Sequence, residues 1–406
     1  MPDPIGTRCC IAGGGPAGVM LGFLLARAGI DVVVLEKHAD FFRDFRGDTI
    51  HPSTLQLMHE LGLLGAFLER PHQEIRQFQA QIGDTALTVA DMTHLPTFSK
   101  FLVLMPQWDF LNFLAENGRR YPSFRLLMET TVTDLIVENG VVRGVRAQTN
   151  AGPLEIRAGL VVGADGRNST VRAAAGLAVT EIGAPMDVLW MRVSRRPDDP
   201  AQVLGRIDFG KMMVMLDRGD YWQCAYVIRK GAFDAIRSAG IEAFRAEVAS
   251  LVPWLGDRLA ELREWNDIKL LTVSVDRLQE WYRPGLLCIG DAAHAMSPIG
   301  GVGINLAVQD AVAAANVLYP AFTRGTPTTA DLRAVQRRRA FPMAVIQNMQ
   351  LAIQNGFLGH VFDVKTKMKP PLALRVFAAI PLLRRIPGYV IGVGVRPEHI
   401  RTPVRH

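Results

Sequence analysis

The stretch RCCIAGGGPAGVMLGFLLARAGIDVVVLE, residues 8–36, decides the fold of this chain. It begins with a short apolar strand, Arg8–Ala12, and continues through a glycine-rich loop into an apolar helix that stops at Gly29. A second apolar run, Val32–Leu35, has the length and composition of a buried strand. A strand, a loop, a helix and a second strand in this order begin a parallel α/β sheet.

The loop inside this stretch has the glycine spacing of a dinucleotide site. Gly13, Gly15 and Gly18 make the pattern G-x-G-x-x-G, and Glu36 ends the second strand. Such a loop brings a pyrophosphate close to the backbone and to a helix N-terminus, and a carboxylate after the next strand can hold ribose hydroxyls. A tight structural turn is the alternative reading, but the complete unit favours dinucleotide binding.

A second informative stretch, GLLCIGDAAHAMSPIGGVGIN, occupies residues 285–305. The apolar run Leu286–Ile289 predicts a buried strand that breaks at Gly290-Asp291, and helical spacing resumes after the later glycines. A turn carboxylate can accept hydroxyl groups, and free N–H groups at a helix start favour negative charge. This stretch therefore predicts a second cradle for a polar, anionic group.

Composition limits the classes of function. The chain has 406 residues, 49% of them hydrophobic, which is enough for two compact lobes. The net charge is +6, and the basic residues form no dense block of the kind seen in nucleic-acid-binding arms. We therefore expect no nucleic-acid partner.

The cysteines and the termini suggest the cellular compartment. Cys9, Cys10, Cys224 and Cys288 fall in predicted strands, and their spacing suits neither a zinc site nor a disulfide framework. The first strand starts within about eight residues, which is too early for a secretory leader. No uncharged run reaches the roughly 18–20 residues that cross a bilayer. We expect a cytoplasmic protein without a metal.

The order of predicted elements indicates a discontinuous organisation. The expected fold class is α/β, with a Rossmann-like nucleotide-binding lobe, a β-sheet substrate lobe inserted discontinuously, and a helical C-terminal region. The nucleotide-binding lobe is expected at residues 1–72, 101–179 and 279–325, the substrate lobe at 73–100 and 180–278, and the helical region at 326–406. The two insertions can form one large sheet, and ligands are usually held in the cleft between such lobes.

The chain resembles the single-component FAD-dependent aromatic hydroxylases, the para-hydroxybenzoate hydroxylase type of flavoprotein monooxygenase. Three motifs carry the resemblance in the order found in that family: the glycine loop at 13–18, Ala164-Asp165-Gly166, and Gly290-Asp291. Together they are specific, and the resemblance covers about residues 5–320. It does not extend to the last eighty or so residues.

The resemblance implies a role for each matching position. Glu36 would hold the adenosine ribose, Arg46 would approach the phosphate and ribityl chain, and Asp291 would accept a ribityl hydroxyl. Pro298 and the following glycine loop would lie against the isoalloxazine ring. The full set of implied FAD-binding residues is Gly13, Gly15, Pro16, Ala17, Gly18, Glu36, Lys37, Arg46, Gln107, Val132, Asp165, Asp291, Pro298, Gly301, Gly303 and Asn305.

The resemblance also implies the reaction. NADH or NADPH, as a transient co-substrate, would reduce FAD, and O2 would then give a flavin C4a-hydroperoxide that hydroxylates an aromatic or polyketide-like small molecule. The flavin carries this chemistry, so no catalytic side chain is assigned. Pro298 and His294 are the weak candidates, and the alternative for His294 is local packing or capping.

The substrate contacts are less well determined. Trp190, Trp222, Gln223 and Tyr226 lie on predicted strands that can line the cleft, and sheet core is the alternative reading for all four. Alternation along a strand places Trp222 and Tyr226 on one face and Gln223 on the other. The sequence does not say which face looks at the flavin.

Several alternatives remain open. A flavin-dependent halogenase would carry a Trp-x-Trp motif, and none of the six tryptophans has that spacing. A reductase of a prenyl-lipid or quinonoid substrate would keep the same FAD motifs, and a flavin-free carrier with this fold is a non-enzymatic alternative. The C-terminal region, apolar and basic from Leu372 onward, can contact a membrane surface, the FAD lobe or a second subunit. A monomer and a homodimer both fit.

Overall fold

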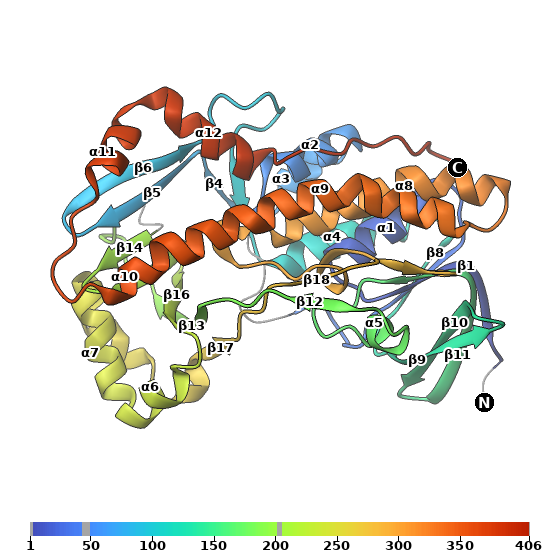
Figure 1. The fold of residues 1–406 in the computed structure, drawn as a ribbon, viewed down its shortest axis with the longest axis horizontal. Coiled ribbons are helices and arrows are strands. Elements are labelled where there is room, and N and C mark those ends of the chain that lie inside the picture. The colour runs from blue at the N-terminus through green and yellow to red at the C-terminus, as the bar shows by residue number, and fades with distance from the viewer. Residues whose placement is uncertain (1–2, 43–48, 201–204, 406) are drawn as a thin grey trace.

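The computed structural model describes residues 3–42, 49–200 and 205–405, and it contains two large sheets joined by long helices (Figure 1). The first sheet has eight strands: β1 (Ile5–Ala12), β2 (Val32–Leu35), β8 (Phe124–Leu127), β9 (Thr131–Glu138), β10 (Val141–Thr149), β11 (Gly152–Gly163), β19 (Tyr282–Arg283) and β20 (Leu286–Cys288). The second has seven: β5 (Gln77–Ile82), β6 (Thr85–Asp91), β13 (Met186–Ser194), β14 (Gly205–Asp208), β15 (Lys211–Asp217), β16 (Tyr221–Arg229) and β17 (Lys269–Leu271).

Two small sheets and a set of helices complete the fold. The small sheets pair β3 (Thr49–Ile50) and β4 (Gln73–Ile75) with β7 (Leu102–Leu104), and β12 (Val179–Glu181) with β18 (Asp276–Leu278). The helices are α1 (Pro16–Arg27), α2 (Pro52–Glu60), α3 (Leu64–Leu68), α4 (Gln107–Gly118), α5 (Thr170–Ala174), α6 (Phe233–Ala239), α7 (Ile241–Leu251), α8 (Gly303–Arg324), α9 (Thr329–Ile353), α10 (Gly359–Asp363), α11 (Leu372–Ala379) and α12 (Pro381–Gly392). Short turns of other helix types are η1 (Pro253–Glu261), η2 (Trp265–Asp267), η3 (Gly290–Ala292), η4 (Ile299–Gly301) and the π-turn η5 (Gln354–Leu358).

The core of the first sheet is parallel. Strands β20, β11, β1, β2 and β8 lie side by side in that order, and the residues of β2 and β20 are fully buried. Strands buried on both faces are apolar throughout, which is why residues 32–35 carry no polar side chain. The carboxyl ends of β1, β11 and β20 therefore meet at one edge of the sheet, and this confirms the predicted strand–loop–helix–strand unit.

The second sheet is built from both insertions. β5 pairs in parallel with β14, with Gln81 opposite Arg206, so residues 77–91 extend the sheet formed by residues 186–271. This confirms that the two insertions form one sheet. The lobe boundaries predicted from the sequence remain a prediction, because β4 joins a small separate sheet with β3 and β7.

Two local features follow from particular residues. Asn139-Gly140 forms the turn of the hairpin between β9 and β10, with φ angles of 50° and 75° at these two residues. Helix α2 has His51 as its N-cap, and no side chain caps it. The helix ends before Gly62, whose φ of 71° is not helical.

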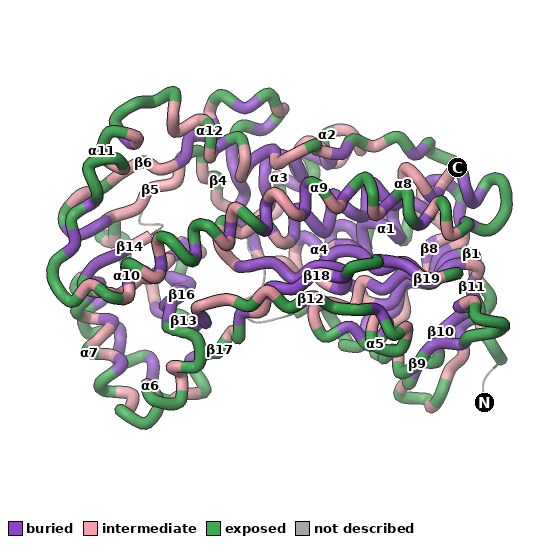
Figure 2. Tube along the Cα trace, viewed as in Figure 1, coloured by how far each residue is buried: buried purple, intermediate pink, exposed green. Residues whose placement is uncertain are grey.

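Helix α8 is the one helix in the described part of the chain that is long and apolar enough to cross a membrane. The stretch Ile299–Arg324 passes this test by length and composition, yet 72% of its apolar window is buried inside the protein. It packs between α1 and α9, where it forms part of the main hydrophobic core (Figures 1 and 2). Its apolar character is therefore explained by burial in the core.

The C-terminal region runs along both sheets. Helix α9 continues through the π-turn into α10 and reaches from the first sheet to the second (Figure 1). Helices α11 and α12 then lie over β6, and the final segment returns to the helices α2, α8 and α1 beside the first sheet. That return is fixed by two hydrogen bonds of 2.9 Å, from Arg27 to the carbonyl of Thr402 and from the amide of Arg405 to the carbonyl of Arg27.

Candidate functional site

Three segments that are far apart in the sequence meet at the carboxyl edge of the first sheet. A methyl group added to Gly13 would lie 2.3 Å from the carbonyl oxygen of Ala164, so the glycine loop touches the second motif. A methyl group added to Gly290 would lie 3.2 Å from the Cβ atoms of both Ala17 and Ala307. The third motif therefore sits between the starts of α1 and α8, as the resemblance requires.

Glycine is required at each of the three positions of the first loop for a separate physical reason. Gly13 has a φ of 107°, which other residues rarely adopt, and a Cβ on Gly18 would lie 1.9 Å from the carbonyl oxygen of Gly13. Gly15 differs, because its Cβ would meet no atom of the described residues closer than 4.0 Å. Its lack of a side chain leaves free space beside the helix start, which suits the pyrophosphate of a dinucleotide.

The helix starts at this edge favour an anion. Neither α1 nor α8 has a side-chain cap or an acidic residue in its first turn. Their first N–H groups therefore keep their partial positive charge, which stabilises negative charge by about 0.3–1 kcal/mol per helix. The donor set and the open space at Gly15 both fit an FAD molecule.

Glu36 lies where a ribose-binding carboxylate is expected. Its side chain is buried and accepts hydrogen bonds from the backbone N–H groups of Gly14 and His38, at 3.1 and 3.0 Å. These contacts fix the carboxylate, and each oxygen can accept a further hydrogen bond from a hydroxyl. The neighbouring Lys37 is exposed.

The structure shows the positions of most other residues that were expected to contact FAD. Gln107 is the first residue of α4 and is half-buried, and Val132 is half-buried in β9. Pro16 and Ala17 form the first turn of α1, and Ala17 is buried. Arg46 lies outside the described residues. The FAD roles of these residues remain predictions.

Asp165 has a local structural role in addition to its position beside the glycine loop. Its carboxylate accepts hydrogen bonds from the hydroxyl of Ser169 at 2.5 Å and from the amide of Val171 at 3.1 Å, at the start of α5. Burial raises the pKa of this carboxyl, although these hydrogen bonds oppose the rise. The backbone of Asp165, not its carboxylate, lies against Gly13.

The two arginines after this motif point to different partners. Arg172 forms an ion pair of 3.1 Å with Asp276. Arg167 approaches Asp291 at 3.8 Å, and the side chain of Asp291 is 35% exposed. Asp291 and Arg167 thus present both an acceptor and a cation at the junction of α1 and α8.

The loop before α8 is held by Asn305. The side-chain oxygen of Asn305 accepts hydrogen bonds from the amide of His51 at 2.9 Å and from the hydroxyl of Thr54 at 2.7 Å. Its nitrogen donates to the carbonyl of Thr49 at 3.2 Å, and the hydroxyl of Thr49 donates to the carbonyl of Gly301 at 2.9 Å. The amide of Asn305 therefore joins two segments of the protein, where a contact with the flavin edge was expected. Gly303, at the start of α8, has open space beside it.

A row of three glutamines, which we call the glutamine ladder, also contacts the loop before α8. Gln347, Gln350 and Gln354 are all buried on one face of α9 and the π-turn. Gln350 accepts from the amide of Ser297 at 3.2 Å and donates to the carbonyls of Ser297 and Ile299 at 2.9 and 2.7 Å.

The other two members of the ladder extend this support along the loop. Gln347 donates to the carbonyls of Asp276 and Ala295 at 3.0 and 3.2 Å, and Gln354 donates to the hydroxyl of Ser297. Sequence reasoning missed these residues. Their spacing of three and four positions was a helical signal, but it did not say which segment the helix would contact.

His294 belongs to a buried ionic network. Its Nε2 lies 2.6 Å from the carboxylate of Asp310, which also forms an ion pair of 2.8 Å with Arg339, and all three side chains are buried. Burial would raise the pKa of Asp310, but His294 and Arg339 outweigh it and hold that pKa below its usual value. The same carboxylate accepts the amide of Gly290 at 3.1 Å. This placement favours the packing alternative for His294 over a role as a base.

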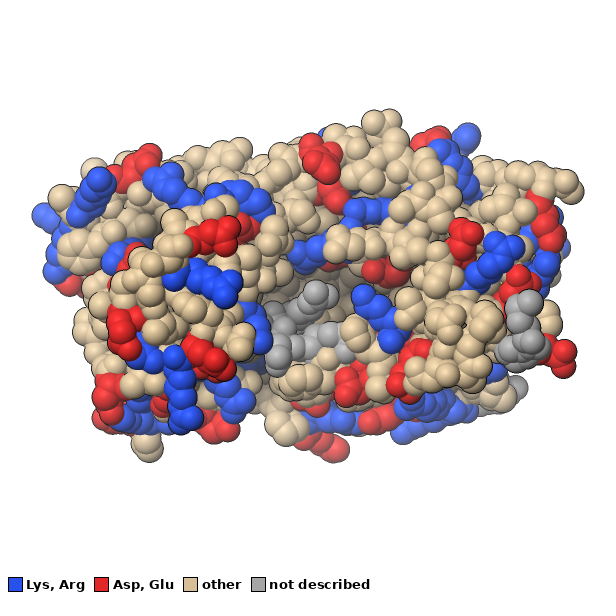
Figure 3. All heavy atoms as spheres, turned by 90° about the horizontal axis from the view of Figure 1, so that it is seen from below, with Lys and Arg blue, Asp and Glu red and all other residues tan. Residues whose placement is uncertain are grey.

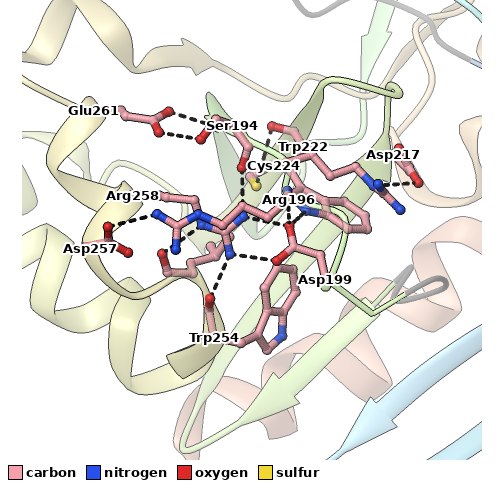
Figure 4. A network of polar contacts seen from close by, with 12 residues as sticks. Ser194, Arg196, Asp199, Asp217, Trp222, Cys224, Trp254, Asp257, Arg258 and Glu261 are labelled. Atoms are coloured by element: carbon pink, nitrogen blue, oxygen red, sulfur yellow. Dashed lines mark hydrogen bonds and ion pairs between the residues drawn. The ribbon is translucent and has the colours of Figure 1, made fainter.

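The second sheet has one face covered by helices. Trp222 and Tyr226 point into a core formed with Phe244, Val248 and Leu251 of α7. Trp222 also donates to Asp199 in the network of Figure 4. The substrate role expected for Trp222 and Tyr226 is therefore not supported, because alternation turns them toward α7.

The network around Trp222 is itself a stabilising element. Arg258 forms an ion pair of 2.6 Å with Asp199, and their side chains are only 3% and 5% exposed (Figure 4). Burial would raise the pKa of Asp199, but Arg258, the amide of Arg196 and the indole of Trp222 lower it to about 2. This pair fastens the loop after β13 to η1, away from the first sheet.

The opposite face of the sheet carries Trp190, Val214 and Leu216, which cluster with apolar residues of β7 and the β6–β7 connection. Gln223 lies on this face too, because it alternates with Trp222. The loop before α8 reaches this sheet through Ile299, which packs with Met186 and Val227. This face, and not the Trp222 face, is turned toward the loop that would meet the flavin ring.

Seen from below, the molecular surface is hollowed between the two parts of the molecule that carry the large sheets (Figure 3). Basic and acidic side chains both stand around this hollow.

Sequence comparisons identify relatives with a common chemistry. Residues 6–349 match the family described as FAD binding domain. The chain is 35% identical over 389 residues to 6-methylpretetramide 4-monooxygenase of Streptomyces rimosus, a match that covers 95% of this chain and 91% of that protein. It is 26% identical over 349 residues to para-nitrophenol 4-monooxygenase of Pseudomonas sp. (strain WBC-3), covering 82% of each.

Solved structures share the fold. The anhydrotetracycline hydroxylase OxyS from Streptomyces rimosus matches with a TM-score of 0.75 and 22% identity, covering 97% of this chain and 77% of that one. PqsL, a probable FAD-dependent monooxygenase from Pseudomonas aeruginosa, matches with a TM-score of 0.73 and 22% identity, covering 88% of this chain and all of that one. At these identities the likeness concerns the fold alone.

Proposed function

This chain belongs to the family of FAD-dependent aromatic hydroxylases and monooxygenases, and on that premise we propose that it consumes NADH or NADPH to hydroxylate a polycyclic, polyketide-like phenol. That it is an FAD-dependent monooxygenase follows from the family. The substrate class is the proposal, and its support is the 35% identity, over 95% of the chain, to an enzyme named for 6-methylpretetramide.

The chain's own residues would hold the cofactor at the carboxyl edge of the first sheet. The N–H groups at the start of α1 would receive the pyrophosphate, Glu36 the adenosine ribose, and Asp291 with Gln107 the ribityl chain. The uncapped start of α8, near Pro298, would place backbone donors at the ring edge and favour negative charge there.

When bound, FAD would supply the redox chemistry, with NADH or NADPH as the reductant and O2 as the oxidant. The protein has to orient the substrate and exclude water. The face of the second sheet that carries Trp190, Val214 and Leu216 is apolar and lies toward the loop at Ile299, which suits both tasks. Gln223, on the same face, offers a polar group to a phenol or a carbonyl of the substrate.

One structural observation supports the placement of the cofactor. Gly290 packs against both Ala17 and Ala307, which brings the third motif to the starts of α1 and α8, and no described residue fills the space beside Gly15. His294, three residues after Asp291, is buried and engaged with Asp310, whose carboxylate also accepts the amide of Gly290. Chemistry supplied by the cofactor, and not by a protein base, is therefore the reading that this arrangement supports.

The test is the balance of the reaction in the purified holoenzyme. NADPH or NADH oxidation is followed together with O2 consumption and product mass, using polycyclic phenols and para-nitrophenol as two substrate classes. We expect the polycyclic phenol to accelerate NAD(P)H oxidation, with one O2 consumed and a product heavier by one oxygen atom.

Two outcomes would contradict the proposal. Full turnover under strict anaerobiosis would indicate a reductase of a quinonoid substrate. Equal or greater acceleration by para-nitrophenol alone would overturn the substrate class while leaving the monooxygenase assignment in place.

A further inference from the structure

Helices α11 and α12 carry an exposed apolar surface at one end of the molecule, over the edge strand β6 (Figures 1 and 2). Large apolar side chains are between 42% and 72% exposed along both helices. These are Leu372, Val376, Ile380, Leu382, Ile386 and Tyr389, which we call the α11–α12 surface. Contiguous exposed apolar side chains of this kind mark an interaction site.

The exposed side chains cannot be buried by a simple rotation of α12. A Cβ on Gly388 would lie 2.0 Å from the carbonyl oxygen of Asp91, and one on Gly392 would lie 2.5 Å from the side chain of Leu95. The two glycines therefore let α12 lie close to the β6 edge, with the face that carries Gly388 and Gly392 turned inward. Leu382 and Ile386 remain on the outer side of the helix, at 66% and 60% exposure.

The charge of this region has one sign. Residues 364–397 contain seven Lys or Arg and no Asp or Glu. Three of the seven cations contact their own chain. Lys367 forms an ion pair of 2.5 Å with Asp84, Arg385 lies 3.0 Å from His94, and the Arg396 guanidinium lies 4.7 Å from the ring centroid of Phe341. Lys365, Lys369 and Arg375 are exposed and form no ion pair among the described residues.

We propose that the α11–α12 surface docks on an anionic lipid surface, with the apolar side chains entering the interface and the cations meeting lipid headgroups. A helix with exposed aliphatic side chains beside Lys and Arg fits this occupant. A second copy of the chain fits less well. In a two-fold interface the same patch meets itself, so the cations would face one another without any acidic residue in residues 364–397 to offset them.

Docking would place the lipid surface beside the substrate sheet. Val393, directly after α12, packs in the same cluster as Trp190 and Val214. An apolar substrate dissolved in the lipid would then have a short apolar route toward the face of the sheet that we assign to the substrate. This route rests on the proposed function, whereas the docking itself does not.

The experiment uses the full-length holoenzyme and sedimentation with vesicles of phosphatidylcholine, alone or mixed with phosphatidylglycerol. The test variant combines Leu382→Glu and Ile386→Glu. The matched control is Val137→Glu, because Val137 is 55% exposed on β9, in the first sheet. Circular dichroism and flavin content establish that each variant is folded.

We expect the wild type to bind the anionic vesicles and not the neutral ones, with binding that weakens as salt is added. The double variant should bind at least about tenfold more weakly, since each aliphatic side chain contributes more than a factor of ten when buried. Val137→Glu should bind as the wild type does.

Three results would overturn the proposal. The first is no sedimentation of the wild type with anionic vesicles, and the second is equal binding by wild type and double variant. The third is a concentration-dependent dimer that the double variant abolishes while vesicle binding is absent, which would assign the surface to a second copy. The double variant should hydroxylate a water-soluble phenol at the wild-type rate. This activity distinguishes a failure of the docking proposal from a failure of the proposed function.

Discussion

Replacing Gln350 by Met tests whether the glutamine ladder positions the loop that meets the flavin. Met has nearly the same length and volume as Gln but removes three hydrogen bonds to Ser297 and Ile299, of 3.2, 2.9 and 2.7 Å. One N–H and two carbonyl groups of a buried loop lose a partner, and each costs about 1–3 kcal/mol when it stays unpaired. Because carbonyls retain a second acceptor site, we expect a total loss of about 2–4 kcal/mol.

The matched control is Gln336→Met on the same helix. Gln336 accepts from the amide of Trp281 at 3.2 Å and donates to the carbonyl of Gln279 at 2.8 Å, so it supports a different segment. It is half-buried, and water can replace part of what is lost. We expect a loss of about 1 kcal/mol in the free energy of unfolding.

The assays are FAD affinity, and product formed per NAD(P)H oxidised. In Gln350→Met a smaller fraction of molecules holds the loop in its binding-competent form, and the apparent dissociation constant rises in proportion. A loss of about 1.4 kcal/mol in the stability of the loop raises the apparent dissociation constant for FAD about tenfold. Coupling should also fall, because a mobile loop admits water to the site. Equal FAD affinity and equal coupling in Gln350→Met and Gln336→Met would refute this reasoning and leave the ladder with a purely structural role.

Three further predictions follow from other groups in the structure. The depressed pKa of Asp199, about 2 against an ordinary 3.8, stabilises the fold by about 2 kcal/mol above pH 4. That stability is lost as the pH falls toward 2, and urea unfolding of Asp199→Asn should lack this dependence. Trp190→Ala should raise KM for the substrate by about tenfold or more. Trp222→Phe should lower the unfolding free energy by about 1–2 kcal/mol and leave the kinetic constants unchanged. Asp310→Asn leaves the buried Arg339 with only the more distant carboxylate of Glu398, at 3.8 Å, and should cost about 3 kcal/mol in denaturant unfolding.

The elements that sequence patterns predicted well are those fixed by local physics. The strand Val32–Leu35 appears with those bounds because a buried parallel strand must be apolar throughout. The turn at Asn139-Gly140 forms because both residues tolerate positive φ. The predicted contact between the glycine loop and the two later motifs is also present, because strands in one parallel sheet end at a common edge.

The features that were not predicted depend on tertiary packing. Alternation separated Trp222 from Gln223, but only the position of α7 shows that the Trp222 face is covered. Asn305 was expected to bind FAD, but only the structure shows that its amide joins His51 and Thr54 to α8. The glutamine ladder shows the same limit, since the helical spacing of Gln347 and Gln350 does not reveal the loop that they contact.

The central claim is that a dinucleotide lies over the loop at Gly15. The φ of Gly15 is −77°, and a methyl group there would meet no atom of the described residues closer than 4.0 Å. Gly15→Ala should therefore change the unfolding free energy of the apoprotein by only about 1 kcal/mol or less. Gly65→Ala is the control, because its methyl group would also meet open space, on α3. The decisive measurement is the FAD dissociation constant of the three apoproteins by fluorescence titration. We predict a rise of more than about tenfold for Gly15→Ala alone; wild-type FAD affinity in a stable Gly15→Ala protein would contradict the account.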